Sequence, residues 1–529
     1  MHGASELGRL WPRRRPGAAG SAAAATALTL AAIFVIWLVY FAPIHAVSVS
    51  TAITGLAGLG AVLLAARYPD RSLLILIVVL PFQGLLLAEL WRLGMPASIV
   101  RHLGAWKETL AIGVILAGIR NYLATGRRAD PLDRLALGFV GIVGVYLVAQ
   151  TAIVPSAPAS ISVRVLAFRQ DAGFVLLLLG ARHAPLPRGF LDRAGRAALA
   201  VATVVASVCV FEALDSSTWN HFVVDTIRYT QYEVGILHAT PPNFYDIRVY
   251  GTIGGTEIVR AGSVFLSALT CGFYLVLGFA LGLERAARGR GSPWLLTALI
   301  VIGAGILLTQ TRSAILAALV VAFIAFQPAA GRRRHSRTQL AILVAALALL
   351  AVPAALSTGL AKRVTGATNN SDHSSAAHVS AFWTGVHNIE AHPLGLGLGT
   401  SAGIGQRFAG HGSDVVIPEN DYLQVGIELG VLPMLLFGVL SVALVLSLRS
   451  AARRRPDPVV AGTWAAAAGL VVAAWLLQTW LDFSVAWTVW GFAGAALGAG
   501  WAEARQRAPA DAPPALSGAP VRSEHPVAA

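Results

Sequence analysis

The amino-acid sequence predicts an all-α membrane protein: a polytopic transmembrane helical bundle of about 12–14 spans with a large, partly helical extracytoplasmic loop. The first observation is composition, since 56% of the 529 residues are hydrophobic and only 12% are charged. Soluble domains carry about 25% charged residues. The second is a series of apolar runs, each near the ~20 residues that a helix needs to cross a bilayer. The third is that basic residues gather in alternate connections between these runs, as the positive-inside rule requires.

The apolar runs divide the chain into about 14 candidate spans, two of which (106–119 and 312–327) are short for a full crossing. The first run follows a basic head and resembles a signal peptide. It is long enough to span, however, and no small-residue cleavage site follows it, so we expect an uncleaved first helix. In order, the candidate spans are 25–42, 47–66, 72–90, 106–119, 135–154, 162–181, 197–213, 262–283, 293–310, 312–327, 338–357, 428–448, 459–481 and 485–503.

The basic residues orient this series. With the N-terminus in the cytoplasm, 28 of the 40 lysines and arginines fall in cytoplasmic connections. The formal net charge of +14 is therefore explained by topology, and we expect no nucleic-acid partner. The predicted organisation is a cytoplasmic head (1–24), a transmembrane bundle with a medium outer loop near 214–261 (25–357), a large extracytoplasmic loop (358–427), C-terminal transmembrane helices (428–503) and a disordered cytoplasmic tail (504–529).

Four of the remaining cations lie at or within the outer ends of spans. Lys107 opens the fourth span, Arg169 lies ~10 Å into the sixth, Arg260 precedes the eighth, and Arg312 lies in a tight turn. A charge at membrane depth costs a few kcal/mol unless it is paired. One interpretation is structural: the side chains extend to lipid headgroups or pair with carboxylates. The other is a site for an anion such as a lipid diphosphate, whose oxygens arginine binds bidentately.

The segment 358–427 is far longer than an ordinary connection and holds five of the 13 histidines. Its glycines at 395, 397 and 399 resemble a phosphate loop but lack the Lys-Ser/Thr of that motif. We therefore expect no nucleotide cofactor and interpret these glycines as allowing tight turns. The histidines match no metal-site spacing, and the two cysteines lie in apolar runs, so we expect neither a metal site nor a disulfide.

Two helices are predicted within this loop. Apolar residues at helical spacing indicate an amphipathic helix that lies in the outer interface or covers a catalytic cavity: Val379, Phe382, Val386 and Ile389, with Trp383 beside them. Pro418 suits the first position of a second helix, with Glu419 and Asn420 in its first turn. Asn420 and Gln424 would then lie one turn apart, where they bind sugar hydroxyls or merely solvate the helix.

Three stretches together resemble the O-antigen ligase and O-antigen polymerase superfamily of polytopic bacterial glycan-transfer enzymes. They are the turn at 308–314 that contains Arg312, the run from His392 to Gly399, and Glu419-Asn420 followed by Gly430. The resemblance covers roughly residues 150–500. There are two departures: Glu419 stands where the family's signature has histidine, and Pro433 stands where it has a second glycine. The lost histidine favours a polymerase-type member over a ligase.

The resemblance implies a metal-independent glycosyltransferase of the bacterial inner membrane, with both termini cytoplasmic, that uses undecaprenyl-pyrophosphate-linked oligosaccharide during surface polysaccharide or exopolysaccharide assembly. Its partners would be a lipid-linked donor, a glycan acceptor, and polysaccharide-export or chain-length proteins. Ligation to another acceptor, a transporter or flippase of lipid-linked glycan, and an export-complex member without chemistry stay open. The expected catalytic residues are Glu419, Arg312 and His411, and the expected substrate-binding residues are Arg169, Arg260, Lys107, His392, Asn420 and Gln424.

Overall fold

A computed structural model describes residues 49–126, 128–155, 160–237, 249–253, 256–289, 292–327, 373–408 and 415–507. The predicted spans at 25–42 and 338–357, the cytoplasmic head and most of the C-terminal tail lie outside the described residues. Within them the chain is helical, apart from one short antiparallel hairpin of β1 (Val249–Ile253) and β2 (Thr256–Val259). The prediction of a polytopic helical membrane protein is confirmed.

The helices of the bundle follow the predicted apolar runs closely. Among the described residues, five helices are long and apolar enough to cross a membrane: Pro69–Arg92, Pro131–Ile153, Phe190–Leu214, Ala268–Ala287 and Val431–Arg454. The bundle comprises α2 (Val49–Arg67), α3 (Pro69–Val79), η2 (Leu80–Phe82), α4 (Gln83–Arg92), α6 (Trp106–Thr125), α7 (Pro131–Ile153), α8 (Ile161–His183), α9 (Phe190–Leu214), α13 (Ala268–Ala287), α14 (Pro293–Leu308), α15 (Arg312–Phe326), α21 (Val431–Arg454), α22 (Pro458–Ala474) and α23 (Phe483–Arg507).

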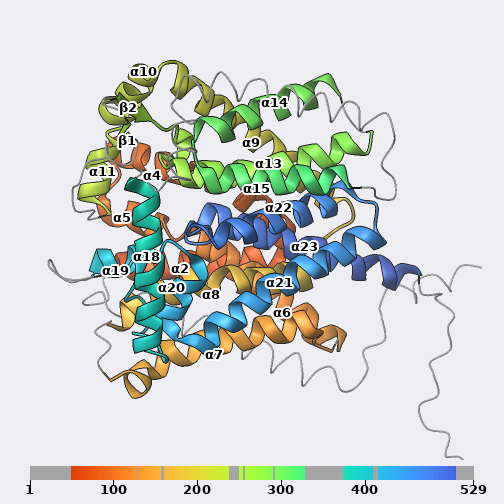
Figure 1. Cartoon of the computed structure of the whole chain (residues 1–529). Coiled ribbons are helices and arrows are strands. Elements are labelled where there is room, and N and C mark those ends of the chain that lie inside the picture. Colours follow the sequence, from red (N-terminus) through yellow and green to blue (C-terminus); the bar gives the residue numbers. More distant parts are fainter. Residues whose placement is uncertain are drawn as a thin grey trace, which may run out of the picture.

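Shorter elements gather at one end of this bundle, which we call the loop end (Figure 1). Most of them come from the two long segments that the charge pattern turns outward, and α5 comes from the connection before α6. Figure 1 shows α18 crossing the ends of the bundle helices, on the same side as the hairpin. The shorter elements are α5 (Ala97–Leu103), α10 (Ser216–His221), η3 (Phe222–Thr226), α11 (Tyr229–Gly235), η4 (Ser263–Phe265), α18 (His373–Ala391), α19 (Ala402–Phe408) and α20 (Asp421–Leu429).

Aromatic rings fill the centre of the bundle. Phe437 of α21 stacks on Phe139 of α7, with ring centroids 5.1 Å apart. Phe174 of α8 lies 4.8 Å from Trp490 of α23, and Tyr422 of α20 lies 5.5 Å from Phe437. All five rings are buried. Such rings bury large apolar areas, so this cluster fixes α20, a loop-end helix, against four helices of the bundle.

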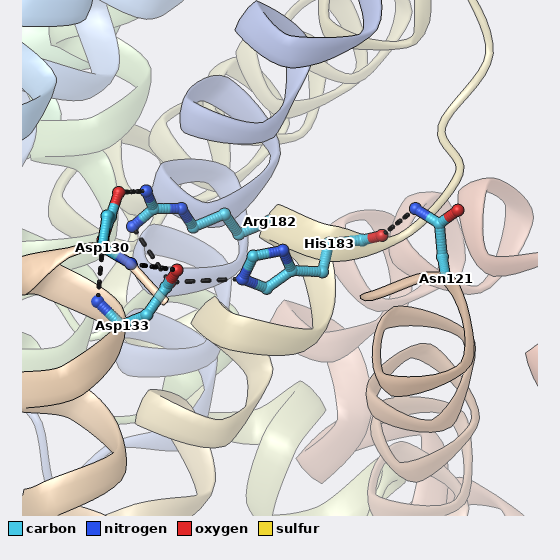
Figure 2. A network of polar contacts seen from close by, with 5 residues as sticks. All are labelled: Asn121, Asp130, Asp133, Arg182 and His183. Atoms are coloured by element: carbon cyan, nitrogen blue, oxygen red, sulfur yellow. Dashed lines mark hydrogen bonds and ion pairs between the residues drawn. The ribbon is translucent and has the colours of Figure 1, made fainter. Parts of the chain in front are cut away.

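A polar network closes the opposite end of α6, α7 and α8 (Figure 2). Arg182 pairs with Asp130 and lies 3.2 Å from Oδ1 of Asp133, which also lies 3.2 Å from Nε2 of His183. The amide of Asn121 donates to the His183 carbonyl at 2.6 Å. Asp130 also caps α7, which begins at a proline. These contacts join three helix ends, about 30 Å from the loop end at 1.5 Å per residue of α7.

The amphipathic helix predicted in the large loop forms as α18, but its apolar residues do not share one environment. Ile389 is buried and packs with Leu423 and Ile427 of α20, whereas Val379 and Trp383 are both 54% exposed. Only the C-terminal half of α18 is therefore seated in the protein by apolar contacts.

Candidate functional site

The glycine-rich segment 395–399 lies alongside the C-terminal end of α20 and is hydrogen-bonded to it. The N–H of Leu396 donates to the carbonyl of Ile427 at 2.7 Å, and the N–H of Gly397 donates to the carbonyl of Glu428 at 2.9 Å. These amides are occupied by the protein itself. The segment is thus a structural strap on α20, and its N–H groups are not a phosphate cradle.

Two glycines make this contact possible. Gly395 has φ +78° and Gly430 has φ +89°, which other residues adopt only at a cost. A Cβ at Gly395 would lie 2.5 Å from the carbonyl oxygen of Glu428, and one at Gly430 would lie 2.3 Å from that of Pro393. The second and third motifs of the sequence are therefore two sides of one close backbone contact.

The side chain of Glu428 completes this junction. Its carboxylate accepts the N–H of Gly399 at 2.9 Å, the N–H of Ser401 at 3.2 Å and the hydroxyl of Ser401 at 2.9 Å. Gln150 of α7 accepts the N–H of Leu398 at 2.8 Å. The strap is consequently held from both α20 and the bundle.

The prediction that Pro418 begins a helix is wrong: α20 begins at Asp421, with Asn420 as its N-cap. The amide oxygen of Asn420 accepts the N–H groups of Tyr422 at 2.9 Å and Leu423 at 3.0 Å. Asparagine is among the best N-caps, and this preference sets the boundary. Glu419 precedes the cap with φ +48°, so the chain turns sharply at the residue that replaces the family's histidine.

The connection between α22 and α23, residues 475–482, contacts the N-terminal end of α20. Nδ2 of Asn420 donates to the carbonyl of Trp475 at 2.8 Å, and Gln478 donates to Gln424 at 3.0 Å. The carboxylate of Asp421 accepts the N–H of Thr479 at 2.7 Å. Burial nonetheless raises the pKa of Asp421 to about 8. The side chains of Asn420 and Gln424, both expected to bind sugar, are used to position this connection.

The same connection leads to two of the predicted cations. Phe483 directly follows it, and the charged groups of Lys107 and Arg169 lie 5.3 and 4.7 Å from the centre of its ring. Both cations contact Oε1 of Glu108, Lys107 at 3.4 Å and Arg169 at 2.9 Å. The Arg169 side chain is 25% exposed and that of Lys107 only 6%, so Arg169 is the more accessible of the two.

Arg260, which follows β2, contacts the turn between α14 and α15, where Arg312 begins α15. The guanidinium of Arg260 is buried and donates to the carbonyl of Thr309 at 2.8 Å and the hydroxyl of Thr311 at 2.7 Å. That hydroxyl in turn donates to the carbonyl of Ala268, at the start of α13, at 3.1 Å. Arg260 therefore shapes the turn, and the half-buried Arg312 starts α15 immediately after it.

The start of α13 connects this turn to the rest of the site. Thr270 donates to Asp482 at 3.2 Å, directly before Phe483. A small cavity lies on the other side of the 475–482 connection, between α8 and α20, and its polar lining consists of Gln170, Asp171, Asp421 and Gln424. The structure thus brings all three motifs, Lys107 and Arg169 to one end of the bundle.

The predicted histidines are not brought together. His392 is exposed at the end of α18, and His411 lies outside the described residues. A different histidine, His378 of α18, contacts the carboxylate of Glu419. Within the described ranges, no group of three histidine, cysteine or acidic side chains is arranged to hold a metal ion.

Sequence reasoning missed Glu108, the partner shared by Lys107 and Arg169, and Asp421, which holds the 475–482 connection. Both had a local signal, because each is an acidic residue directly beside a predicted site residue. The contact between His378 and Glu419 had no such signal, since 41 positions separate the two residues in the chain.

Residues 297–438 match the family model described as O-antigen ligase. This range contains all three motifs, the large loop and the start of α21, but not Lys107, Arg169 or Arg260. No curated protein matches the chain. The sequence resemblance is confirmed over this narrower range: residues 297–438 of this polytopic helical membrane protein are similar to the O-antigen ligase family.

Proposed function

We propose that this protein is a membrane glycosyltransferase that polymerises undecaprenyl-pyrophosphate-linked oligosaccharide at the extracytoplasmic face. The observation that carries the proposal is that the three motifs, Arg169 and Lys107 lie at one end of the bundle. A chain of contacts joins them, from the strap to α20, from α20 to residues 475–483, and through α13 to the turn before α15. These elements are far apart in the sequence, and a packing role would not require their polar groups to meet at one end of the bundle.

The donor is a glycan whose leaving group is a lipid diphosphate. Arg169 and Arg312 are the accessible cations that bind it, while Lys107 and Arg260 support them from buried positions. The diphosphate displaces part of the contact between Arg169 and Glu108 and takes its place on the guanidinium. Preorganised cations stabilise the charge that develops on the departing diphosphate, and no nucleotide sugar is needed because the leaving group arrives on the lipid.

The acceptor is a sugar hydroxyl, which enters under α18. Glu419, whose side chain is 39% exposed, or a loop histidine takes the hydroxyl proton. The hydroxyl oxygen bonds to the anomeric carbon as the bond from that carbon to the diphosphate oxygen breaks. The electron pair of the broken bond leaves with the lipid diphosphate.

The exchange of the signature histidine for Glu419 supports polymerisation over ligation to a distinct acceptor. The charge pattern supports an inner-membrane orientation with cytoplasmic termini and the loop end outside. The second candidate is a ligase of the same donor. A transporter or flippase using the same arginines as an anion path is disfavoured by the interlocked strap, which a moving gate would have to release.

Purified protein supplied with lipid-linked oligosaccharide separates these functions. Longer chains mean a polymerase, product on a second acceptor means a ligase, and movement of unchanged substrate across a vesicle means a transporter. In cells, a deletion strain that retains single units but loses long surface chains gives the same answer. Substrate that is only moved, with no new glycosidic bond, refutes the proposal.

A further inference from the structure

We propose that His378 of α18 is the group that takes the acceptor proton, and that Glu419 is the positioning residue that holds its imidazole. The inference rests on the proposed function and names its base. The imidazole comes from α18, about 40 residues before Glu419 in the sequence.

The contact between the two side chains uses one of the two imidazole nitrogens. Nδ1 of His378 meets Oε2 of Glu419, and both atoms are shielded from solvent. The two side chains are nevertheless 31% and 39% exposed. The opposite edge of the imidazole carries Nε2. A carboxylate against Nδ1 favours the tautomer that carries its proton on that nitrogen, and this leaves Nε2 to accept a proton.

The packing of α18 on α20 supports this contact. Gly385 approaches so closely that a Cβ there would lie 3.2 Å from Pro418 and 3.3 Å from Leu423. One turn further, Ile389 is buried against Leu423 and Ile427. Two turns before Gly385 the helix reaches His378, opposite Glu419. Glu419, two residues before the start of α20, has a left-handed backbone conformation (φ +48°). Such conformations in residues other than glycine concentrate at functional sites.

The chemistry suits an imidazole paired with a carboxylate. Histidine changes charge between about pH 5 and 8 and is the most frequent general base. Nε2 takes the proton of the acceptor hydroxyl, whose oxygen bonds to the anomeric carbon, and the diphosphate leaves with the electron pair. The resulting imidazolium lies against the Glu419 carboxylate, which stabilises its charge. Within the described residues, Glu419 is the charged group in contact with His378.

The principal test uses His378→Gln, with His387→Gln as the matched control. His387 lies on the same helix, is 71% exposed and pairs with Glu390, not with Glu419. Glycan transfer by the purified protein should fall about 100- to 10,000-fold in kcat/KM for His378→Gln and stay unchanged for His387→Gln. Imidazole added to His378→Ala should restore part of the activity.

The pH profile provides a test that leaves His378 in place. In the unsubstituted protein, kcat/KM should fall at low pH as the imidazole becomes protonated. In Glu419→Gln an acid limb should remain, because the imidazole is still present as the base. Disappearance of the limb in Glu419→Gln would make Glu419 itself the base and overturn the inference.

The proposed function and the assignment of His378 are refuted by different results. If the unsubstituted protein forms no product from lipid-linked oligosaccharide, the proposed function fails and this inference falls with it. If it forms product and His378→Gln retains full activity with the same acid limb, only the assignment of His378 fails. A His378→Gln variant that does not fold leaves the Glu419→Gln profile to decide.

Discussion

Oε2 of Glu428 accepts the N–H of Gly399 at 2.9 Å, and this bond joins α20 to the glycine-rich segment. Together with the bonds from Ser401, it explains why a carboxylate is buried near the end of α20. The strap places the loop between α18 and α20 against the bundle, where it also bonds Gln150 of α7.

The close contact between the strap and α20 predicts a severe effect of Gly395→Ala. A left-handed conformation costs a residue with a Cβ about 1–2 kcal/mol, and the new methyl would lie 2.5 Å from a backbone carbonyl. We expect the detergent-solubilised variant to unfold at a clearly lower temperature and to lose glycan transfer. Gly403→Ala is the control, because a Cβ there meets nothing within 4 Å. Equal melting temperatures for both variants would contradict this account.

The positions of the spans could be predicted from the sequence, whereas the contacts between motifs could not. An apolar run of about 20 residues indicates its own helix, and α7, α9 and α21 follow their runs closely. The end of α22 was predicted at 481, but it ends at Ala474. The reason is tertiary: Asp421 accepts the N–H of Thr479, so this stretch leaves the helix to bond α20, which no local pattern indicates.

Some residues of the candidate site could likewise be predicted from the sequence, whereas others could not. Arg312 and Arg169 attract attention because a charge in an apolar run is costly. Asparagine favours the N-cap position, which is where Asn420 lies. The helix start predicted at Pro418 placed Asn420 in the first turn, so its capping role was not predicted. The pairing of Glu108 with both Lys107 and Arg169 depends on how α6 packs on α8, and it is therefore visible only in three dimensions.

Removal of the accessible guanidinium at the α14–α15 turn should abolish transfer. We expect Arg312→Ala to lower glycan transfer by roughly 100-fold or more, the range measured when one preorganised donor to a developing negative charge is lost. Membrane insertion and melting temperature should be unchanged. Arg92→Ala is the matched control, because Arg92 is 34% exposed and pairs with Glu89 of its own helix. Full activity of Arg312→Ala would exclude its role with the diphosphate.

The network at the other end of the bundle should contribute stability without contributing to transfer. Arg182→Ala leaves Asp133 buried without a guanidinium partner, and loss of one member of a buried pair costs about 3–5 kcal/mol. Arg196→Ala breaks only an exposed pair with Asp192 and should cost about 0.3–0.5 kcal/mol. Thermal unfolding in detergent measures the difference. A stable Arg182→Ala protein would mean that water reaches this network.

The buried carboxyl of Asp421 predicts a pH dependence of stability. Its pKa is about 8 in the folded protein and 3.8 as its ordinary value, so between these values the folded state holds a proton that the unfolded state has released. Stability from this group is therefore fully present below pH 3.8 and falls as pH rises, by at most about 1.4 kcal/mol per pH unit. Melting temperatures of Asp421→Asn should vary less between pH 5 and about 8 than those of the unsubstituted protein. Identical slopes would show that this carboxyl is ionised in the folded state.

The orientation of the bundle predicts a labelling pattern. The native cysteines, Cys209 and Cys271, are both buried, so single cysteines can be introduced into the otherwise unchanged chain. Leu394 is 59% exposed at the loop end, and Leu394→Cys should react with an impermeant thiol reagent applied to intact spheroplasts. Arg128 is exposed beside α7 at the opposite end, and Arg128→Cys should react only after lysis. The reverse pattern would place the strap, α18 and Glu419 in the cytoplasm, where a donor that is presented at the outer face could not reach them.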